Sequence, residues 1–241
     1  MYAILTALKL EADCFIEKMS INSVHKWNSY KFNIGTFAEH ECIIGHTGIG
    51  KVNAAVAVSH IIENYHPAIV FYTGIGGSLK SDLNIGDVLI AQDSMQWDID
   101  ITPFGFRPGE LPSANSLSDK MEDTENVRFY KSDSELLKKA EKWNPGGFKV
   151  KKGRIITGDS FFSQTLQDNK TDLLKEVDAA AVDMEGAAAG AACRIHHVPF
   201  FLSRVISDTV NGTKPKRFKH FMKVSSCKMA DLIEALLSDF S

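Results

Sequence analysis

The 241-residue sequence lacks any block of lysine or arginine and any long apolar run. Its formal net charge is only -3, and a chain without clustered positive charge is a poor candidate for binding nucleic acid. A membrane-spanning helix needs about 20 consecutive apolar residues. Charged residues also interrupt the N-terminal segment at Lys9, Glu11 and Asp13, too early for a signal-peptide core. These absences predict a soluble, cytoplasmic protein with neither a nucleic-acid nor a membrane partner.

Cysteine and histidine patterns typical of metal sites are also missing. Cys14, Cys42, Cys193 and Cys227 form no C-x-x-C pair, which argues against a structural zinc site and against a dense disulfide framework. We therefore expect four buried thiols, as in most cytoplasmic proteins. The sequence contains no H-E-x-x-H and no G-x-S-x-G motif, so neither a zinc protease nor a nucleophile elbow is indicated.

The sequence does contain short apolar, β-branched runs that alternate with helical patterns. The expected strands cover residues 2–7, 30–37, 41–47, 68–73, 87–91, 153–157, 179–182 and 199–206. The expected helices cover residues 11–19, 51–65, 134–143, 185–196 and 218–237. A long loop is expected between about residues 97 and 126. This alternation predicts one α/β domain over residues 1–241, with helices on both faces of a sheet.

Acidic residues follow several of the expected strands. Glu185 lies with Asp183 in the least polar segment of the chain, the Ala- and Gly-rich residues 179–192, where a carboxylate needs a protein partner or a ligand. Glu11 and Asp208 also lie at or just beyond strand ends, where open α/β sheets bind their ligands. Cleavage of a glycosidic bond needs an acid for the leaving group, a base for water and a negative charge near the sugar.

Each of these residues also has a purely structural interpretation. Glu11 and Glu185 would favour the positive end of the helix that each begins, and Asp208 could cap a helix or a turn. Arg204, four residues before Asp208, could neutralise one of the acids. The glycines at 74–77 would let the backbone approach a ligand closely, or only another element of the fold.

Taken in order, seven segments resemble one family. They are T-A-L-K-L-E-A-D, H-T-G-I-G-K-V-N-A-A, Y-T-G-I-G-G-S, D-I-T-P-F-G, T-G-D-S-F-F, V-D-M-E-G-A-A-A and S-R-V-I-S-D-T. The chain resembles the purine nucleoside phosphorylase/uridine phosphorylase superfamily, and within it the 5′-methylthioadenosine/S-adenosylhomocysteine nucleosidases. The resemblance implies a three-layer α/β/α sandwich with a mixed central sheet. It further implies N-glycosidic bond hydrolysis by a homodimer that uses no metal or organic cofactor.

The resemblance also implies roles for individual residues. Glu11 matches the acid that activates water, and Asp208 matches the acid that protonates adenine at N7 and accepts from its 6-amino group. Glu185, preceded by Met184, matches the acid that holds the ribose hydroxyls. Arg204 matches an arginine near the water and the ribose.

Further matches form the surroundings of the substrate. Phe161 matches the ring that stacks on the purine, and Phe162 matches the neighbour whose backbone bonds the base. The apolar pocket for the 5′-alkylthio group is matched by Leu8, Ile49 and Phe218. The residues delivered by the second subunit of a homodimer are matched by Ile101, Phe104 and Pro112.

The first strand and the glycine segment bear on the reaction type. Family phosphorylases hold phosphate with a glycine and an arginine after the first strand, whereas this chain has Glu11, which would repel phosphate; Lys9 leaves the question open. Ile75 stands where related nucleosidases commonly have a serine. The aspartate at Asp208 favours a 6-aminopurine because it accepts an N–H. The alternatives are a futalosine hydrolase, another purine nucleosidase or phosphorylase, and a non-catalytic nucleoside-binding protein.

Overall fold

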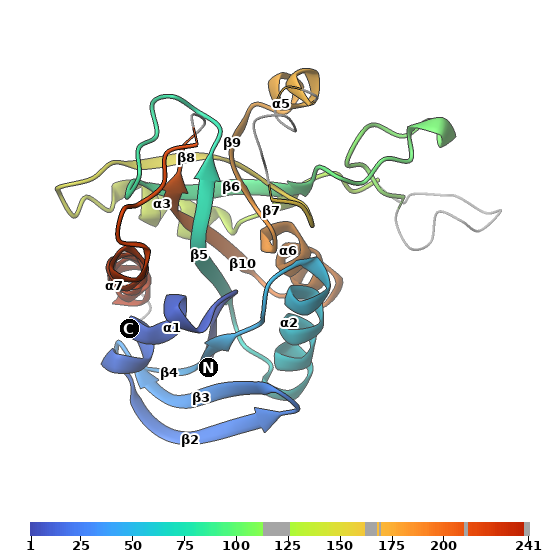
Figure 1. The fold of residues 1–241 in the computed structure, drawn as a ribbon. Coiled ribbons are helices and arrows are strands. Elements are labelled where there is room, and N and C mark those ends of the chain that lie inside the picture. The colour runs from blue at the N-terminus through green and yellow to red at the C-terminus, as the bar shows by residue number, and fades with distance from the viewer. Residues whose placement is uncertain (113–125, 162–167, 169, 210–211, 239–241) are drawn as a thin grey trace.

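The computed structural model describes residues 1–112, 126–161, 168, 170–209 and 212–238, and these form a mixed sheet with helices on both faces (Figure 1). The strands are β1 Tyr2–Thr6, β2 Ser20–Trp27, β3 Tyr30–Phe37, β4 His40–His46, β5 Val70–Ser78, β6 Val88–Gln96, β7 Tyr130–Lys131, β8 Val150–Thr157, β9 Ala179–Asp183 and β10 Phe200–Asp208. The helices are α1 Lys9–Lys18, α2 Lys51–Tyr65, α3 Ser134–Lys142, α5 Thr171–Glu176, α6 Gly186–Ile195, α7 Phe218–Leu237 and the short 3-10 helix η1 Thr102–Phe104. The predicted α/β architecture with a mixed central sheet is confirmed.

Part of the sheet closes on itself. The strand order is β10-β6-β8-β9-β5-β1-β4-β3-β2, with β7 beside β6, and β10 also pairs with β5. The strands β5, β10, β6, β8 and β9 therefore form a closed ring of pairings, from which β1, β4, β3 and β2 extend. β1 and β10 run parallel to β5, whereas β9 runs antiparallel to it. The residues that follow β9 therefore approach the end of β5 from a different direction than the residues that follow β1 and β10.

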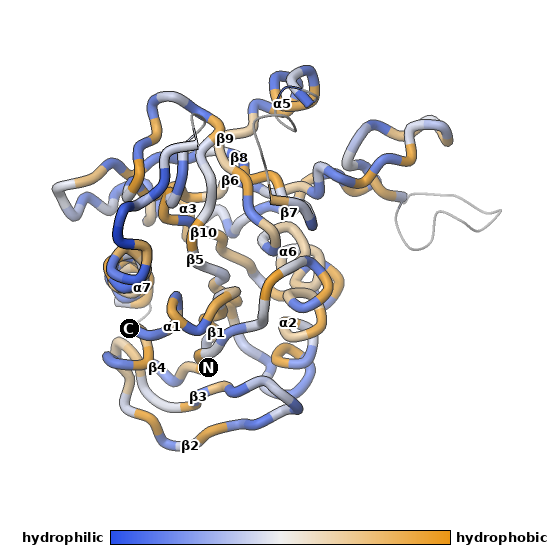
Figure 2. Tube along the Cα trace, viewed as in Figure 1, coloured by the Kyte–Doolittle hydropathy of each residue, from blue (hydrophilic) through white to orange (hydrophobic). Residues whose placement is uncertain are grey.

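The two faces of the sheet are covered by different helices. α2 and α6 pack on one face through residues such as Val58 and Ala192. α1, α3 and α7 pack on the other through residues such as Phe15, Leu136 and Met229. α7 alternates between hydrophobic and hydrophilic colours along its trace (Figure 2), as expected of an amphipathic helix that buries one face. Burial of these apolar faces holds the helices against the sheet.

Several elements differ from the prediction. β5 continues through the glycines at 74–77, which we expected to end the strand. β2 and α5 were not predicted: β2 is largely exposed and mostly polar, so it lacks the apolar alternation of a half-buried strand. The predicted loop after residue 97 includes η1 and the isolated bridge between Leu111 and Val127. Figure 1 shows the segment around η1, in green, extending outward from the sheet.

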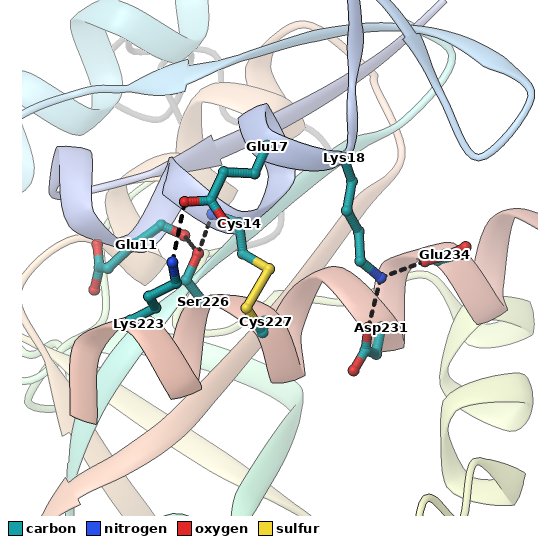
Figure 3. Close-up of a disulfide and its surroundings, with 9 residues drawn as sticks. All are labelled: Glu11, Cys14, Glu17, Lys18, Lys223, Ser226, Cys227, Asp231 and Glu234. Carbon is teal, nitrogen blue, oxygen red and sulfur yellow. Dashed lines mark hydrogen bonds and ion pairs between the residues drawn. A yellow bond between two sulfur atoms is a disulfide. The ribbon is translucent and has the colours of Figure 1, made fainter. Parts of the chain in front are cut away.

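The prediction of four buried thiols was wrong. Cys14 on α1 and Cys227 on α7 form a disulfide with a Cα–Cα distance of 5.1 Å, while Cys42 and Cys193 are buried and free. The paired residues are 213 positions apart, so no local spacing pattern signals the bond; packing of α1 against α7 creates it. Beside it, Ser226 Oγ accepts a hydrogen bond from the Cys14 N–H at 3.0 Å and donates one to the Glu11 carbonyl at 2.6 Å (Figure 3).

No helix within the described residues is long and apolar enough to cross a membrane.

Reduction of the Cys14–Cys227 disulfide should lower the melting temperature. The bond closes nearly the whole chain into a loop and so restricts the unfolded state; such bonds typically contribute about 2–4 kcal/mol. For a chain of this length that corresponds to a drop of roughly 5–15 °C. Thermal unfolding with and without a reductant measures it. A Cys14→Ser/Cys227→Ser variant should not respond to reductant, whereas Cys193→Ser should respond like the wild type. An unchanged melting temperature on reduction would contradict the prediction.

Candidate active site

A cavity of about 160 Å³ opens beside the last residues of β5, β9 and β10 and the residues that follow β1. Most of the residues that the sequence nominated for a site contribute to its surface. These are Leu8, Glu11, Ile49, Phe161, Met184, Glu185 and Asp208. The fold therefore brings these residues from five separate segments of the chain to one cavity, and Ile75, Gly76 and Gly77 of β5 add a sixth.

The other nominated residues lie elsewhere. Arg204 is buried behind the cavity, where it contacts the acids rather than the open space. Phe218 begins α7, is half exposed and does not line the cavity. Phe162 lies outside the described residues. The three residues expected from a second subunit do not line the cavity of their own chain: Ile101, Phe104 and Pro112. Of these, Phe104 is 80% exposed in the segment that extends outward.

Glu11 lies in the first turn of α1, and its carboxylate accepts hydrogen bonds from two backbone N–H groups. The Leu8 N–H donates to Oε2 at 2.7 Å, and the Ile75 N–H donates to Oε1 at 2.9 Å. A Cβ atom on Gly74 would lie 2.5 Å from Oε1, so only glycine allows this approach. Burial raises the pKa of Glu11 above its usual value, although the charge of Arg204 opposes the shift. A carboxylate whose pKa is raised towards neutral is a better general base.

Arg204 neutralises Asp183, as one of the structural interpretations anticipated for this arginine. Its Nη2 lies 2.6 Å from Asp183 Oδ2 and 4.0 Å from Glu185 Oε2. Asp183 also accepts hydrogen bonds from Thr157 Oγ1 at 2.5 Å and from the Gly186 N–H at 3.1 Å. Asp183 therefore fixes both the arginine and the first turn of α6.

Glu185 is a second buried acid on the cavity surface. The Gly50 N–H donates to its Oε1 at 2.9 Å. Burial and the neighbouring charge of Asp183 raise the pKa of Glu185 to about 7, and Arg204 opposes this shift. Three carboxylates thus share one guanidinium, with Glu11 as the third. Since unpaired buried charge is costly, we expect this cluster to retain a proton near neutral pH.

Asp208 reaches the cavity from the last position of β10. Ser207 Oγ donates a hydrogen bond to its Oδ1 at 2.7 Å and also lies 3.3 Å from the Gly76 carbonyl oxygen. A Cβ on Gly77 would lie 2.8 Å from Asp208 Oδ2, and one on Gly76 would lie 3.3 Å from the Arg204 side chain. The glycines of β5 therefore make room for the carboxylates of Glu11 and Asp208 and for the Arg204 side chain, as well as for neighbouring atoms of Val182.

Ile75 turns towards the cavity, not into the core. It is partly exposed, lines the cavity and contributes its N–H to Glu11. Its side chain offers no hydrogen bond at this position.

Backbone donors and neighbouring hydroxyls were the functional groups that sequence analysis missed. The N–H groups of Gly50 and Ile75, and the hydroxyl of Ser207, all contact cavity acids. Backbone N–H groups occur at nearly every position, so nothing in a sequence marks these two. The serine before Asp208 was the available signal. Among the described residues, no group of three or more His, Cys, Asp or Glu side chains is arranged to hold a metal ion.

Comparison with known proteins agrees with the fold. The family model described as "Phosphorylase superfamily" matches residues 1–238. The 5′-methylthioadenosine/S-adenosylhomocysteine nucleosidase of Staphylococcus haemolyticus is 32% identical over 239 residues, covering 98% of this chain and 99% of the relative. The Neisseria meningitidis nucleosidase of the same name, solved with methylthio-immucillin-A, is 26% identical with a TM-score of 0.84, covering 99% of this chain and 98% of the other. Futalosine hydrolase of Helicobacter pylori is 25% identical with a TM-score of 0.83, covering 99% and 97%.

The chain belongs to the phosphorylase superfamily. Within it, the full-length similarity to nucleosidases makes the protein an N-glycosyl hydrolase. The family resemblance expected from the sequence motifs is confirmed.

The substitution Glu185→Gln should stabilise the protein at alkaline pH. An unfolded glutamate has its pKa near 4.5, whereas Glu185 titrates near 7 in the fold. Between these values the folded protein holds a proton that the unfolded chain has released, so stability falls as pH rises. The variant should exceed the wild type in unfolding free energy by on the order of 2–3 kcal/mol at pH 8, with a smaller excess at pH 5. Denaturant titrations at both pH values measure it.

The exposed Glu135→Gln serves as the control and should show no such pH-dependent gain. An equal difference between Glu185→Gln and wild type at pH 5 and pH 8 would contradict the raised pKa.

Proposed function

We propose that the protein hydrolyses 5′-methylthioadenosine and S-adenosylhomocysteine to adenine and the corresponding thioribose. The observation that carries this proposal is the convergence of Glu11, Glu185 and Asp208 on one cavity, in a chain similar over its full length to nucleosidases of that name.

Glu11 activates the attacking water in this proposal. It takes a proton from water as the oxygen bonds to C1′ of the ribose and the bond from C1′ to N9 of adenine breaks. Its raised pKa supports the role of a base. Two backbone N–H groups fix its orientation, so the carboxylate is preorganised for the water.

Asp208 protonates adenine at N7 as the glycosidic bond breaks. Adenine leaves poorly as an anion, so the electrons of the broken bond are accommodated by a base that gains a proton at the same time. Ser207 Oγ beside Asp208 Oδ1 supports a fixed carboxyl orientation. The other carboxyl oxygen is then available to accept from the 6-amino group, which favours adenine.

Glu185 holds the ribose hydroxyls between these two residues. Its position at the start of α6 places a hydrogen-bond acceptor on the cavity surface beside Met184. Arg204, paired with Asp183 behind the cavity, contributes positive charge near the water and the sugar. A negative charge on Glu185 in the transition state would stabilise the oxocarbenium-like ribose.

The remaining assignments concern the apolar contacts. We assign Phe161 to stacking on the purine and the backbone of Phe162 to bonding the base. We assign the 5′-alkylthio group to Leu8 and Ile49 on the cavity surface and, on the family resemblance, to Phe218 at the start of α7. We propose a homodimer in which a partner subunit supplies Ile101, Phe104 and Pro112 to this end of the site. The exposure of Phe104 and of Val52 on α2, 80% and 73%, supports an interface between copies of the chain.

We further propose that residues 1–241 act as a single nucleoside phosphorylase-like domain, without a cofactor, in cytoplasmic nucleoside catabolism and methionine salvage. Futalosine hydrolysis is a second candidate, favoured by the likeness to futalosine hydrolase. Comparison of kcat/KM for the three nucleosides decides between them.

Adenine release should not require phosphate. The first strand is followed by Leu8 and Glu11 on the cavity, and a carboxylate there disfavours an anionic nucleophile. Purified protein incubated with methylthioadenosine should release free thioribose equally with and without phosphate, measured by adenine and reducing-sugar assays. Formation of a ribose 1-phosphate derivative only when phosphate is present would contradict hydrolysis.

The substitutions Glu11→Gln and Asp208→Asn should each lower kcat by on the order of 10² or more, because each removes a proton-transfer group. Steady-state kinetics with methylthioadenosine measure the effect. Asp13→Asn on α1 and Asp231→Asn on α7 are matched controls, since both acids pair with exposed lysines outside the cavity. Turnover near wild type in either cavity variant would remove that residue from the mechanism.

A further inference from the structure

We propose that Lys51 is a positioning residue that fixes the purine-stacking Phe161 against the start of α2, and so sets affinity for the base without taking part in bond cleavage. The inference rests on the proposed function, because it concerns the base end of the same cavity.

Lys51 forms a partly buried ion-pair cluster at the rim of the cavity. Its Nζ lies 2.7 Å from Asp98 Oδ1 and 3.6 Å from Asp159 Oδ2. The Lys51 side chain is only 16% exposed and that of Asp98 only 22%. The Asp159 side chain is 52% exposed. Isolated pairs on an open surface contribute little, whereas the largely buried pair of Lys51 with Asp98 has a defined geometry.

Backbone hydrogen bonds join the same groups. The Lys51 N–H donates to Asp159 Oδ1 at 3.0 Å, and the Asp159 N–H donates to Asp98 Oδ2 at 2.9 Å. Asp159 is therefore held through its carboxylate and its backbone. Phe161 follows two residues later and lines the cavity, although its side chain is 63% exposed. Little else in the described part of the chain restrains this ring, apart from Lys214 Nζ at 4.7 Å from its centre.

The start of α2 links this loop to the sugar end of the cavity. The Gly50 N–H donates to Glu185, and the next N–H, that of Lys51, donates to Asp159. Gly50 has a φ of 93°, a backbone conformation that glycine adopts without strain. Two adjacent residues thereby set the distance between the group that holds ribose and the group that stacks on the base.

Asp98 connects Lys51 and Asp159 to the segment that projects from the sheet. It follows the buried Trp97 and precedes η1, the element that ends at Phe104. Lys51 therefore connects three segments distant in sequence: α2, the loop after β8 and the chain after β6. Loss of its charge leaves Asp98 and Asp159 close together without a cation between them, and like charges at this distance repel.

The test compares Lys51→Met with Lys51→Arg and Asp98→Asn. Steady-state kinetics with methylthioadenosine should show KM raised about tenfold in Lys51→Met with kcat within about threefold, since base–aromatic stacking is weakened. The dissociation constant of adenine alone, measured by calorimetry, should rise by a similar factor. Lys51→Arg should recover most of the loss because it keeps the charge, and Asp98→Asn should fall between. Lys138→Met, which removes an exposed lysine paired with Glu135 on α3, is the control and should match wild type.

Three results would overturn the inference: unchanged KM and adenine affinity in Lys51→Met, a loss confined to kcat, or equal defects in Lys51→Met and Lys51→Arg. If Lys51→Met does not fold, the adenine affinity of Asp98→Asn decides, and a wild-type value overturns the proposal. Failure of the proposed function is distinguishable, because a wild-type protein without hydrolytic activity can still show a Lys51-dependent affinity for adenine.

Discussion

The ion pair between Arg204 and Asp183 is the interaction on which the rest of the site depends. It lies in the interior, where an unpartnered guanidinium would be strongly unfavourable. Asp183 neutralises the arginine and also bonds the first turn of α6. The charge of Arg204 also opposes the rise that burial causes in the pKa of Glu11 and of Glu185. Without this pair, Glu11 and Glu185 would lack the positive charge that now compensates their own negative charge.

Space for this charged cluster comes from small residues. β5 passes the cavity with glycines whose missing side chains admit the carboxylates of Glu11 and Asp208 and the stem of Arg204. α6 is built largely of alanine and glycine, and a Cβ on Gly190 would lie 2.8 Å from the Tyr130 side chain. The glycines, which weaken local secondary structure, therefore permit the close packing that the site requires. Stability in this region must come from tertiary contacts and from the backbone donors that hold the acids.

Most of the architecture could be predicted from local pattern. The helix over Lys51–Tyr65 and the C-terminal helix Phe218–Leu237 were predicted with their observed bounds, because each has a sustained apolar face. β2 was not predicted, because its mostly exposed side chains give no alternation of apolar and polar residues. Seven of the nominated site residues meet at one cavity, and the motifs that named them also led to the right family. The cysteine prediction failed because the pairing of Cys14 with Cys227 depends on how two distant helices pack.

The sequence by itself determined the alternation of strands and helices, the family and the residue types of the site, since these follow from hydrophobic periodicity and from short motifs. Only the tertiary structure decided which groups meet. β9 runs antiparallel to β5, yet closure of the strand ring brings Glu185 to the same cavity as Glu11 and Asp208. It also decided that Arg204 pairs with Asp183, that Ile75 faces the cavity, and that the N–H groups of Gly50 and Lys51 bond separate acids. Such contacts join residues far apart in the chain, and their free energies depend on burial and distance, which no local pattern records.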